Sequence, residues 1–194
     1  MAERVITATR LRDDQRLAVD LDGEAWIALD ALEAARLGLE VGAILDAAVI
    51  AEAETSAARD GALQRGARLV GRRSHARGEL ERKLAHTSGD DAARDAADRL
   101  AALGALDDER HARELAAQRL AAGWGPGRIA HDLEAAGVAA AVVVATLAAL
   151  DADEVLAAAR RAVGDRTGAA GWQRLGARGF DEEIAERLLG LPDA

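Results

Sequence analysis

Three consecutive carboxylates, Asp107, Asp108 and Glu109, are the first side chains that could do chemistry, because clustered carboxylates are ligands that hard cations prefer. The spacing, the glycine and the distal glutamate of a calcium-binding loop are missing around them. Acidic side chains are also typical of the first turn of a helix, where the helix dipole is positive. The sequence therefore favours a helix start over a metal site.

The histidines and the glycines give no catalytic site either. No two of His75, His86, His111 and His131 have the one-turn spacing of a metal-binding helix, so we expect ordinary surface or partly buried histidines. The chain has no cysteine, which excludes thiolate sites and agrees with a reducing compartment. The glycine-rich run at 123–127 lacks the preceding strand and the following Lys-Ser/Thr of a phosphate loop. We expect no metal, no cofactor and no enzyme.

Basic side chains gather in one part of an otherwise acidic chain. The formal net charge is −9, whereas residues 63–106 carry nine basic and six acidic side chains. A solvated face balanced by Glu79 and Glu81 and a binding surface are both compatible with this pattern. An acidic protein gains little from counterion release on DNA, so a mixed-charge protein partner is favoured over nucleic acid. The concentration comprises Arg65, Arg68, Arg72, Arg73, Arg77, Arg82 and Lys83.

The stretch from Leu106 to Ile129 reads as a helix, a tight joint and a second helix. Gly123 is suited to the left-handed conformation that ends a helix, and Pro126 to the first turn of the next one. Trp124 and Gly125 lie between them. We expect Trp124 to be packed in this joint rather than exposed as an anchor for a partner.

The N-terminal segment predicts a small β-hairpin with a following helix. Apolar residues alternate on both sides of Asp22-Gly23, a dipeptide that suits a two-residue turn, and residues 5–11 could add a third strand. A simple two-residue loop would pair Val19 with Trp26, so the register stays open. Asp30 predicts a helix start and Gly38 its end. Residues 46–72 form either one long helix weakened by Gly61 and Gly66 or two helices.

The second half of the chain repeats itself. Leu133, Gly137 and Val138 match Leu175, Gly179 and Phe180 at a constant offset, and a weaker copy precedes them. We predict a mainly α protein of tandem three-helix repeats that form an elongated curved array behind the N-terminal module. Val142, Val143, Val144 and Leu147 are expected in its core. The predicted divisions are 1–62 (hairpin and helix), 63–106, 107–150 and 151–194.

Three stretches together resemble the RecX family of recombinase regulators. They are Arg73 to Leu84, Leu106 to Ala112, and Gly123 to Ile129, and the Gly179-Phe180 step belongs to the same pattern. The resemblance covers residues 63–194. It implies an all-helical protein of three-helix repeats that binds the RecA recombinase and its filament on DNA. It also implies that the protein lies in the filament groove and suppresses ATP hydrolysis, strand exchange and filament growth.

The resemblance favours binding over a solvated face for the basic residues. We assign partner binding to Arg72, Arg73, Arg77, Arg82, Lys83, Arg110 and Arg128. The structural signature of the family pattern is Asp107, Asp108, Glu109, Gly123, Trp124, Gly125 and Pro126. Contacts are expected from the arginines on the flanks of the joint rather than from Trp124.

The sequence departs from the family pattern at two places. Ala76 replaces a helix-capping serine, at a cost of about 1 kcal/mol unless Ser74 substitutes. The third repeat is glycine-rich between Val163 and Trp172, which predicts a shortened middle helix.

Two alternatives to a RecA regulator stay open. One is a stand-alone nucleic-acid-binding protein that uses the basic patch at 65–83, and the other is a scaffold for an unrelated protein. The sequence shows neither a signal peptide nor a membrane span, so we expect a cytoplasmic protein. We also expect a monomer that makes at most weak direct contact with DNA.

Overall fold

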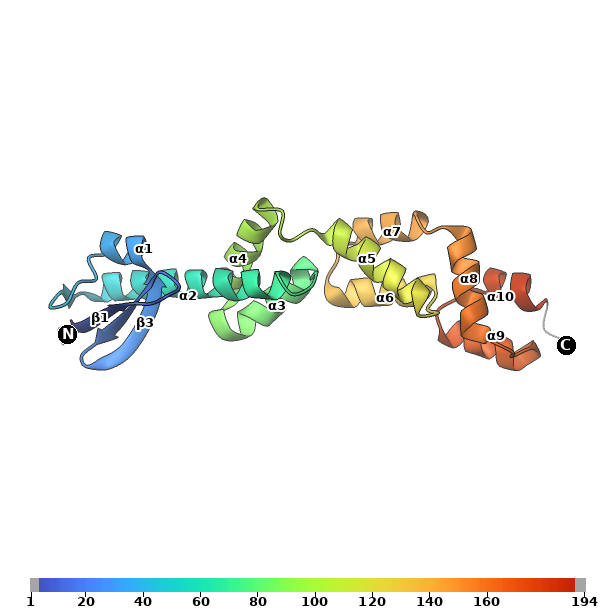
Figure 1. Ribbon diagram of the computed structural model, residues 1–194, viewed down its shortest axis with the longest axis horizontal. Helices are drawn as coiled ribbons and strands as arrows, with labels where there is room; N and C mark the ends of the chain where they lie inside the picture. The colour runs from blue at the N-terminus through green and yellow to red at the C-terminus, as the bar shows by residue number, and fades with distance from the viewer. Residues whose placement is uncertain (1–3, 191–194) are drawn as a thin grey trace. The chain divides into compact units, whose positions relative to one another are not determined.

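A computed structural model describes residues 4–190 as a small antiparallel sheet followed by helices (Figure 1). The fold is mainly α, as predicted. The strands, in chain order, are β1 (Arg4–Leu11), β2 (Arg16–Leu21), β3 (Glu24–Asp30) and β4 (Ile44–Leu45). The helices are α1 (Ala31–Arg36), α2 (Ala47–Val70), α3 (Arg77–Ser88), α4 (Asp90–Ala102), α5 (Asp108–Ala121), α6 (Pro126–Ala136), α7 (Ala140–Ala148), α8 (Ala152–Val163), α9 (Gly168–Ala177) and α10 (Glu182–Leu189).

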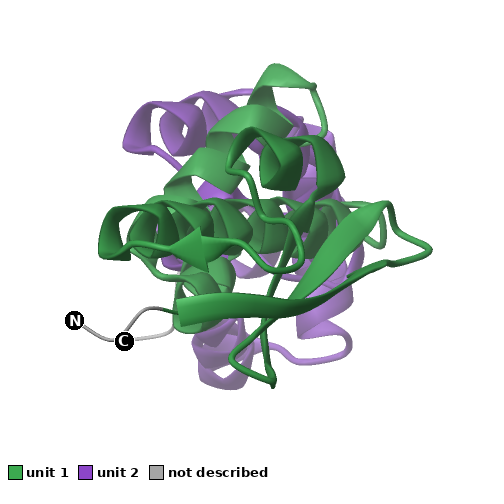
Figure 2. Cartoon of the chain, turned by 90° about the vertical axis from the view of Figure 1, so that its left-hand side faces the viewer, with its two compact units in different colours: residues 1–73, 80–106 green, residues 74–79, 107–194 purple. Residues whose placement is uncertain are grey.

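The chain divides into two compact units (Figure 2). Unit 1 comprises residues 1–73 and 80–106, and unit 2 comprises residues 74–79 and 107–194. The first residues of α3 therefore group with unit 2, while the rest of α3 groups with unit 1. The intervals 107–150 and 151–194 each hold three helices.

The N-terminal sheet has the strand order β3-β2-β1-β4, and all three pairings are antiparallel. Val19 pairs with Ile27, and an irregularity between Val19 and Asp20 gives β3 one extra residue. This bulge resolves the open register, because it moves Ile27 opposite Val19 and frees Trp26. Trp26 donates its indole N–H to Glu54 of α2 at 3.0 Å.

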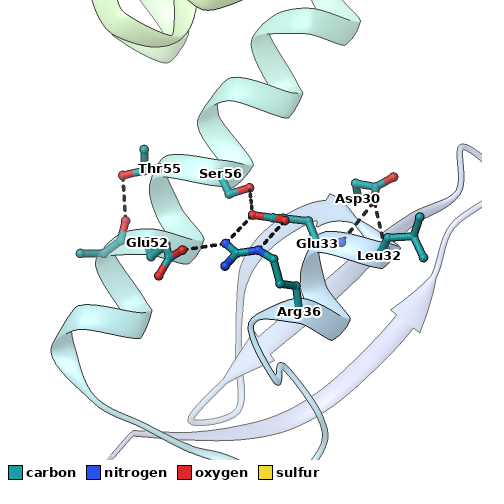
Figure 3. A network of polar contacts seen from close by, with 8 residues as sticks. Asp30, Leu32, Glu33, Arg36, Glu52, Thr55 and Ser56 are labelled. Carbon is teal, nitrogen blue, oxygen red and sulfur yellow. Dashed lines mark hydrogen bonds and ion pairs between the residues drawn. The ribbon is translucent and has the colours of Figure 1, made fainter.

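Helix α1 is attached to α2 by a polar network (Figure 3). Asp30 caps α1, as predicted, because its carboxylate accepts the backbone N–H groups of residues 32 and 33. Arg36 donates to Glu33 at 2.8 Å within α1 and to Glu52 of α2 at 2.6 Å. The hydrogen bond from Arg36 lowers the pKa of Glu33, and a bond from Ser56 acts in the same direction. The network joins the sheet module to α2.

Helix α2 is one continuous helix of 24 residues, which decides between the two predictions for residues 46–72. The predicted boundary between residues 62 and 63 falls inside it, so the N-terminal module and the first three-helix interval share this helix. Gly66 is buried, and a Cβ atom there would lie 2.7 Å from the Leu100 side chain of α4. The glycine therefore permits close packing of α2 against α4 rather than breaking the helix.

The internal repeat has a clear structural basis in unit 2. Gly137 and Gly179 both adopt positive φ, at 84° and 80°. The next residues, Val138 and Phe180, donate their N–H groups back to Leu133 and Leu175 at 3.0 and 3.1 Å. All four apolar side chains are buried. Both copies therefore end a helix on a left-handed glycine that is followed by a buried apolar residue.

Two details differ from the prediction. Helix α9 has ten residues, close to the eleven of α6, so the middle helix of the third repeat is not shortened. Val144 is 66% exposed, because α7 presents only one face to the core formed by Val143 and its neighbours.

Candidate functional site

The predicted helix start at the acidic triplet is confirmed, and each carboxylate lies in a different setting. Asp107 caps α5 and accepts the backbone N–H of Arg110 at 2.9 Å, which lowers the pKa of Asp107. Asp108 accepts the backbone N–H of Arg77, the first residue of α3, at 2.7 Å. Glu109 lies 3.7 Å from Arg113, one turn along α5.

Asp108 supplies the hydrogen-bond acceptor that a capping serine at position 76 would have provided. Ala76 is fully buried directly before α3, and the first N–H of α3 is instead accepted by Asp108 of α5. Ser74 places its hydroxyl 3.0 Å from Nδ1 of the buried His111. His75 is also buried, with Nδ1 3.1 Å from Glu79. Two of the four histidines are therefore interior residues of unit 2.

The joint of the middle repeat is built by backbone contact with the third repeat. Gly125 donates its N–H to the carbonyl of Arg178 at 2.8 Å, and Gly127 donates to the carbonyl of Gly179 at 2.9 Å. A Cβ atom on Gly125 would lie 2.4 Å from the Gly179 oxygen. Glycines are needed here because any side chain would separate the two backbones. We call this contact the glycine joint.

Trp124 is packed at the glycine joint but only half-buried. The Cζ atom of Arg178 lies 4.1 Å from the centre of its ring, and that of Arg128 lies at 5.2 Å. These are cation–π distances. Trp124 is therefore packed in the joint, as predicted, but its ring contacts arginine side chains and stays partly exposed.

Asp132 links the arginines at the glycine joint. It accepts Nε–H bonds from Arg119 at 2.6 Å and from Arg128 at 2.9 Å, and its side chain is 12% exposed. Burial alone would raise the pKa of Asp132, but the bonds from Arg119 and Arg128 outweigh burial and hold the pKa below its ordinary value. The carboxylate is therefore charged at neutral pH.

Two more arginines, one in α8 and one at the end of α9, donate to backbone carbonyls at the end of α5. Arg161 donates to the carbonyl of Leu120 at 2.9 Å, and Arg178 donates to that of Ala122 at 3.4 Å. Cations are stabilised at the negative C-terminal end of a helix, which is here the end of α5. We call Arg119, Arg128, Arg161 and Arg178 the joint arginines.

The seven residues predicted to bind a partner are divided between the two units. Arg72, Arg73, Arg82 and Lys83 belong to unit 1, and all four side chains are exposed. Arg77, Arg110 and Arg128 belong to unit 2. Arg110 is exposed in the first turn of α5, Arg77 is half-buried, and Arg128 pairs with Asp132.

Sequence reasoning missed most of the joint arginines. Arg128 and Asp132 have the one-turn spacing of a helical ion pair, which is a usable signal. Arg119, Arg161 and Arg178 come from three other helices or helix ends, and nothing in the local sequence links them. Arg65, a member of the predicted basic patch, is half-buried and hydrogen-bonds to Ser88.

The described residues offer no metal centre or membrane span. Within residues 4–190, no three His, Cys, Asp or Glu side chains gather so as to hold a metal ion. Over the same range, every helix is too short or too polar to cross a membrane.

Comparisons with known proteins agree with the repeat pattern. Residues 107–147 match the family model described as RecX, second three-helix domain. A regulatory protein RecX from Halorhodospira halophila is 39% identical over 122 residues, which span 62% of this chain and 72% of the relative. A regulatory protein RecX from Xanthomonas axonopodis pv. citri is 40% identical over 92 residues, or 47% of this chain and 57% of that relative.

Solved structures show the same fold. A crystal structure of a regulatory protein RecX has a TM-score of 0.68 at 17% identity, and the match covers 94% of this chain and 97% of that structure's chain. RecX from Lactobacillus salivarius has a TM-score of 0.58 at 15% identity and covers 68% of this chain and 94% of its own. With the glycine joint, the left-handed helix ends and the relative matched over 72% of its length, the chain belongs to the RecX family of regulatory proteins.

Proposed function

We propose that this protein binds the RecA recombinase filament on DNA and lowers its ATP hydrolysis, strand exchange and extension. Membership of a regulatory family supports a protein partner. The observation that carries the proposal for the binding residues is the exposure of Arg72, Arg73, Arg82 and Lys83 on unit 1. Arginine offers a planar fork that fits carboxylates of a partner. In this account the protein acts in the cytoplasm as a monomer.

Regulation by binding requires a difference in affinity between filament states. A ligand that bound every state of the filament equally would shift nothing. We therefore propose that the protein binds a filament conformation or end that is unproductive for growth and turnover.

The binding step is tested with RecA assembled on surface-attached single-stranded DNA. The wild-type chain is expected to bind these filaments and to bind the bare DNA far more weakly. Replacing Arg72, Arg73 and Arg77 by Glu should weaken filament binding by about tenfold or more, because the new carboxylates would then face the carboxylates of the partner. The matched control reverses the exposed Arg59, Arg160 and Arg187, which changes the net charge equally and should leave binding within about threefold.

Two results would contradict this proposal. Equal weakening by both triple variants would assign the effect to net charge rather than to the predicted residues. Binding to bare DNA as tight as to the filament, and falling steeply with salt, would instead favour a stand-alone nucleic-acid-binding protein.

A further inference from the structure

The joint arginines form a positive surface on an acidic unit. Among residues 74–79 and 107–190 there are eleven arginines and fifteen carboxylates. Arg161 and Arg178 donate to carbonyl groups at the end of α5, and Arg119 and Arg128 hydrogen-bond to Asp132 of α6. The local surplus of positive charge is an arrangement that attracts an anionic group.

The guanidinium groups still have donors to offer. Each carries five N–H donors in a fixed fork. Arg161 is exposed and donates one hydrogen bond to the carbonyl of Leu120. Arg178 is half-buried and donates one hydrogen bond to the carbonyl of Ala122, while its guanidinium group lies over the Trp124 ring. A carboxylate arriving from solvent can therefore be bound without breaking these contacts.

A groove lies directly beside this surface. It has a volume of about 260 Å³ and runs between α5 and α8. Its α5 side is apolar and consists of Ala117, Leu120 and Ala121, and its α8 side consists of Glu154, Ala157 and Arg161. Arg161 therefore belongs both to the groove and to the joint arginines. The groove offers room for an apolar side chain next to a carboxylate-binding surface.

The geometry points to a docking site on unit 2 for a short segment of a protein partner that carries carboxylates next to an apolar side chain. The segment places its apolar side chain in the groove and its carboxylates on Arg161 and Arg178. This site is distinct from the exposed cations of unit 1, and it stands whether or not the partner is RecA.

A protein segment fits this surface better than nucleic acid does. Arg119 and Arg128 already hold one carboxylate, that of Asp132, through their Nε–H groups. The Trp124 ring, on which a base would stack, has the Arg178 guanidinium 4.1 Å from its centre. The α5 side of the groove is apolar, which suits an aliphatic side chain better than a sugar–phosphate backbone.

Trp124 provides a local probe of this site. Replacing Trp26 and Trp172 by Phe leaves Trp124 as the single tryptophan of the chain. The peptide Glu-Glu-Leu-Glu-Glu, acetylated and amidated, is titrated into this full-length variant at low salt. A saturable change in Trp124 emission is expected, because a carboxylate at Arg178 alters the field at the ring. Replacing Arg161 and Arg178 by Gln should weaken peptide binding by about tenfold.

Two controls separate specific peptide binding from effects of misfolding or of net charge. Replacing the exposed Arg160 by Gln, next to Arg161 on α8, should leave peptide binding within about twofold. The peptide Gln-Gln-Leu-Gln-Gln should not bind. Equal binding of both peptides, or an absence of saturation with the glutamate peptide, overturns the proposal even if the arginine variants fold poorly. Tighter binding of a short oligothymidylate than of the glutamate peptide overturns it in favour of a nucleic-acid surface.

Discussion

At the scale of single residues, Asp132 is the charge that organises the glycine joint. It is largely buried and accepts hydrogen bonds from Arg119 at 2.6 Å and Arg128 at 2.9 Å. Breaking a largely buried charge-assisted pair costs more than removing an exposed ion pair, because the partners keep their desolvation cost. Replacing Asp132 by Asn should therefore destabilise unit 2 by about 1–3 kcal/mol at neutral pH.

The same carboxylate predicts a pH dependence. The pKa of Asp132 is lowered in the folded state, because the arginine bonds outweigh the effect of burial. Its stabilising effect is therefore fully present above the unfolded pKa of about 4 and is lost as the pH falls through the lower folded value. The difference in melting temperature between wild type and Asp132→Asn should shrink as the pH is lowered from about 6 to about 2. A difference that stays constant over this range would contradict the assigned pairing.

Residue types alone predicted part of the site. The helix start at the acidic triplet and the left-handed Gly123 at the end of α5 follow from local rules that need no tertiary contacts. The hydrogen bond of Asp108 with the first N–H of α3 joins residues that are distant in the sequence, so no local rule predicts it. Arg161 and Arg178 converge on the end of α5 from distant positions, so the sequence carried no local signal for them.

At the scale of elements, the glycine joint sets how the second and third three-helix intervals meet. The backbones of Gly125 and Gly179 are close enough that a Cβ on either would overlap backbone atoms of the other interval at 2.4 Å. Such an overlap cannot be relieved by a rotamer change, so the helices must separate. The glycines therefore determine how closely the two three-helix intervals approach each other.

Replacing Gly125 by Ala tests the joint. We expect a loss of stability of about 1–3 kcal/mol from overpacking against backbone, measured by thermal or urea unfolding. Gly176 provides a matched control, because it lies in α9 with no atom within 4 Å of an added Cβ. Gly176→Ala should stabilise the helix by up to about 1 kcal/mol. Equal effects of the two substitutions would show that the joint is not closely packed.

Elements were predictable where hydrophobic periodicity and helix ends coincide, as in α5, α6 and their repeat. The bulge opposite Val19 was not predictable, since a turn sequence alone does not determine strand register. The sequence also left the continuity of α2 open. Gly66 lowers the local helix propensity, whereas its close packing against Leu100, which the sequence does not show, requires a small residue.

At the scale of the whole molecule, both compact units carry arginines that we propose bind a partner. Net charge alone indicated an acidic protein and gave no location for binding. The structure locates exposed cations on unit 1 and the joint arginines on unit 2. The chain belongs to a family of regulatory proteins, and we propose that these surfaces bind its partner.

We propose that the protein lowers ATP hydrolysis by the RecA filament because it binds the filament. ATP hydrolysis by RecA on single-stranded DNA is measured while the chain is titrated in. Hydrolysis should fall at less than equal stoichiometry to RecA, and the Arg72, Arg73 and Arg77 to Glu variant should need about tenfold more protein for the same effect. Unchanged hydrolysis in the presence of excess wild-type protein would contradict the account.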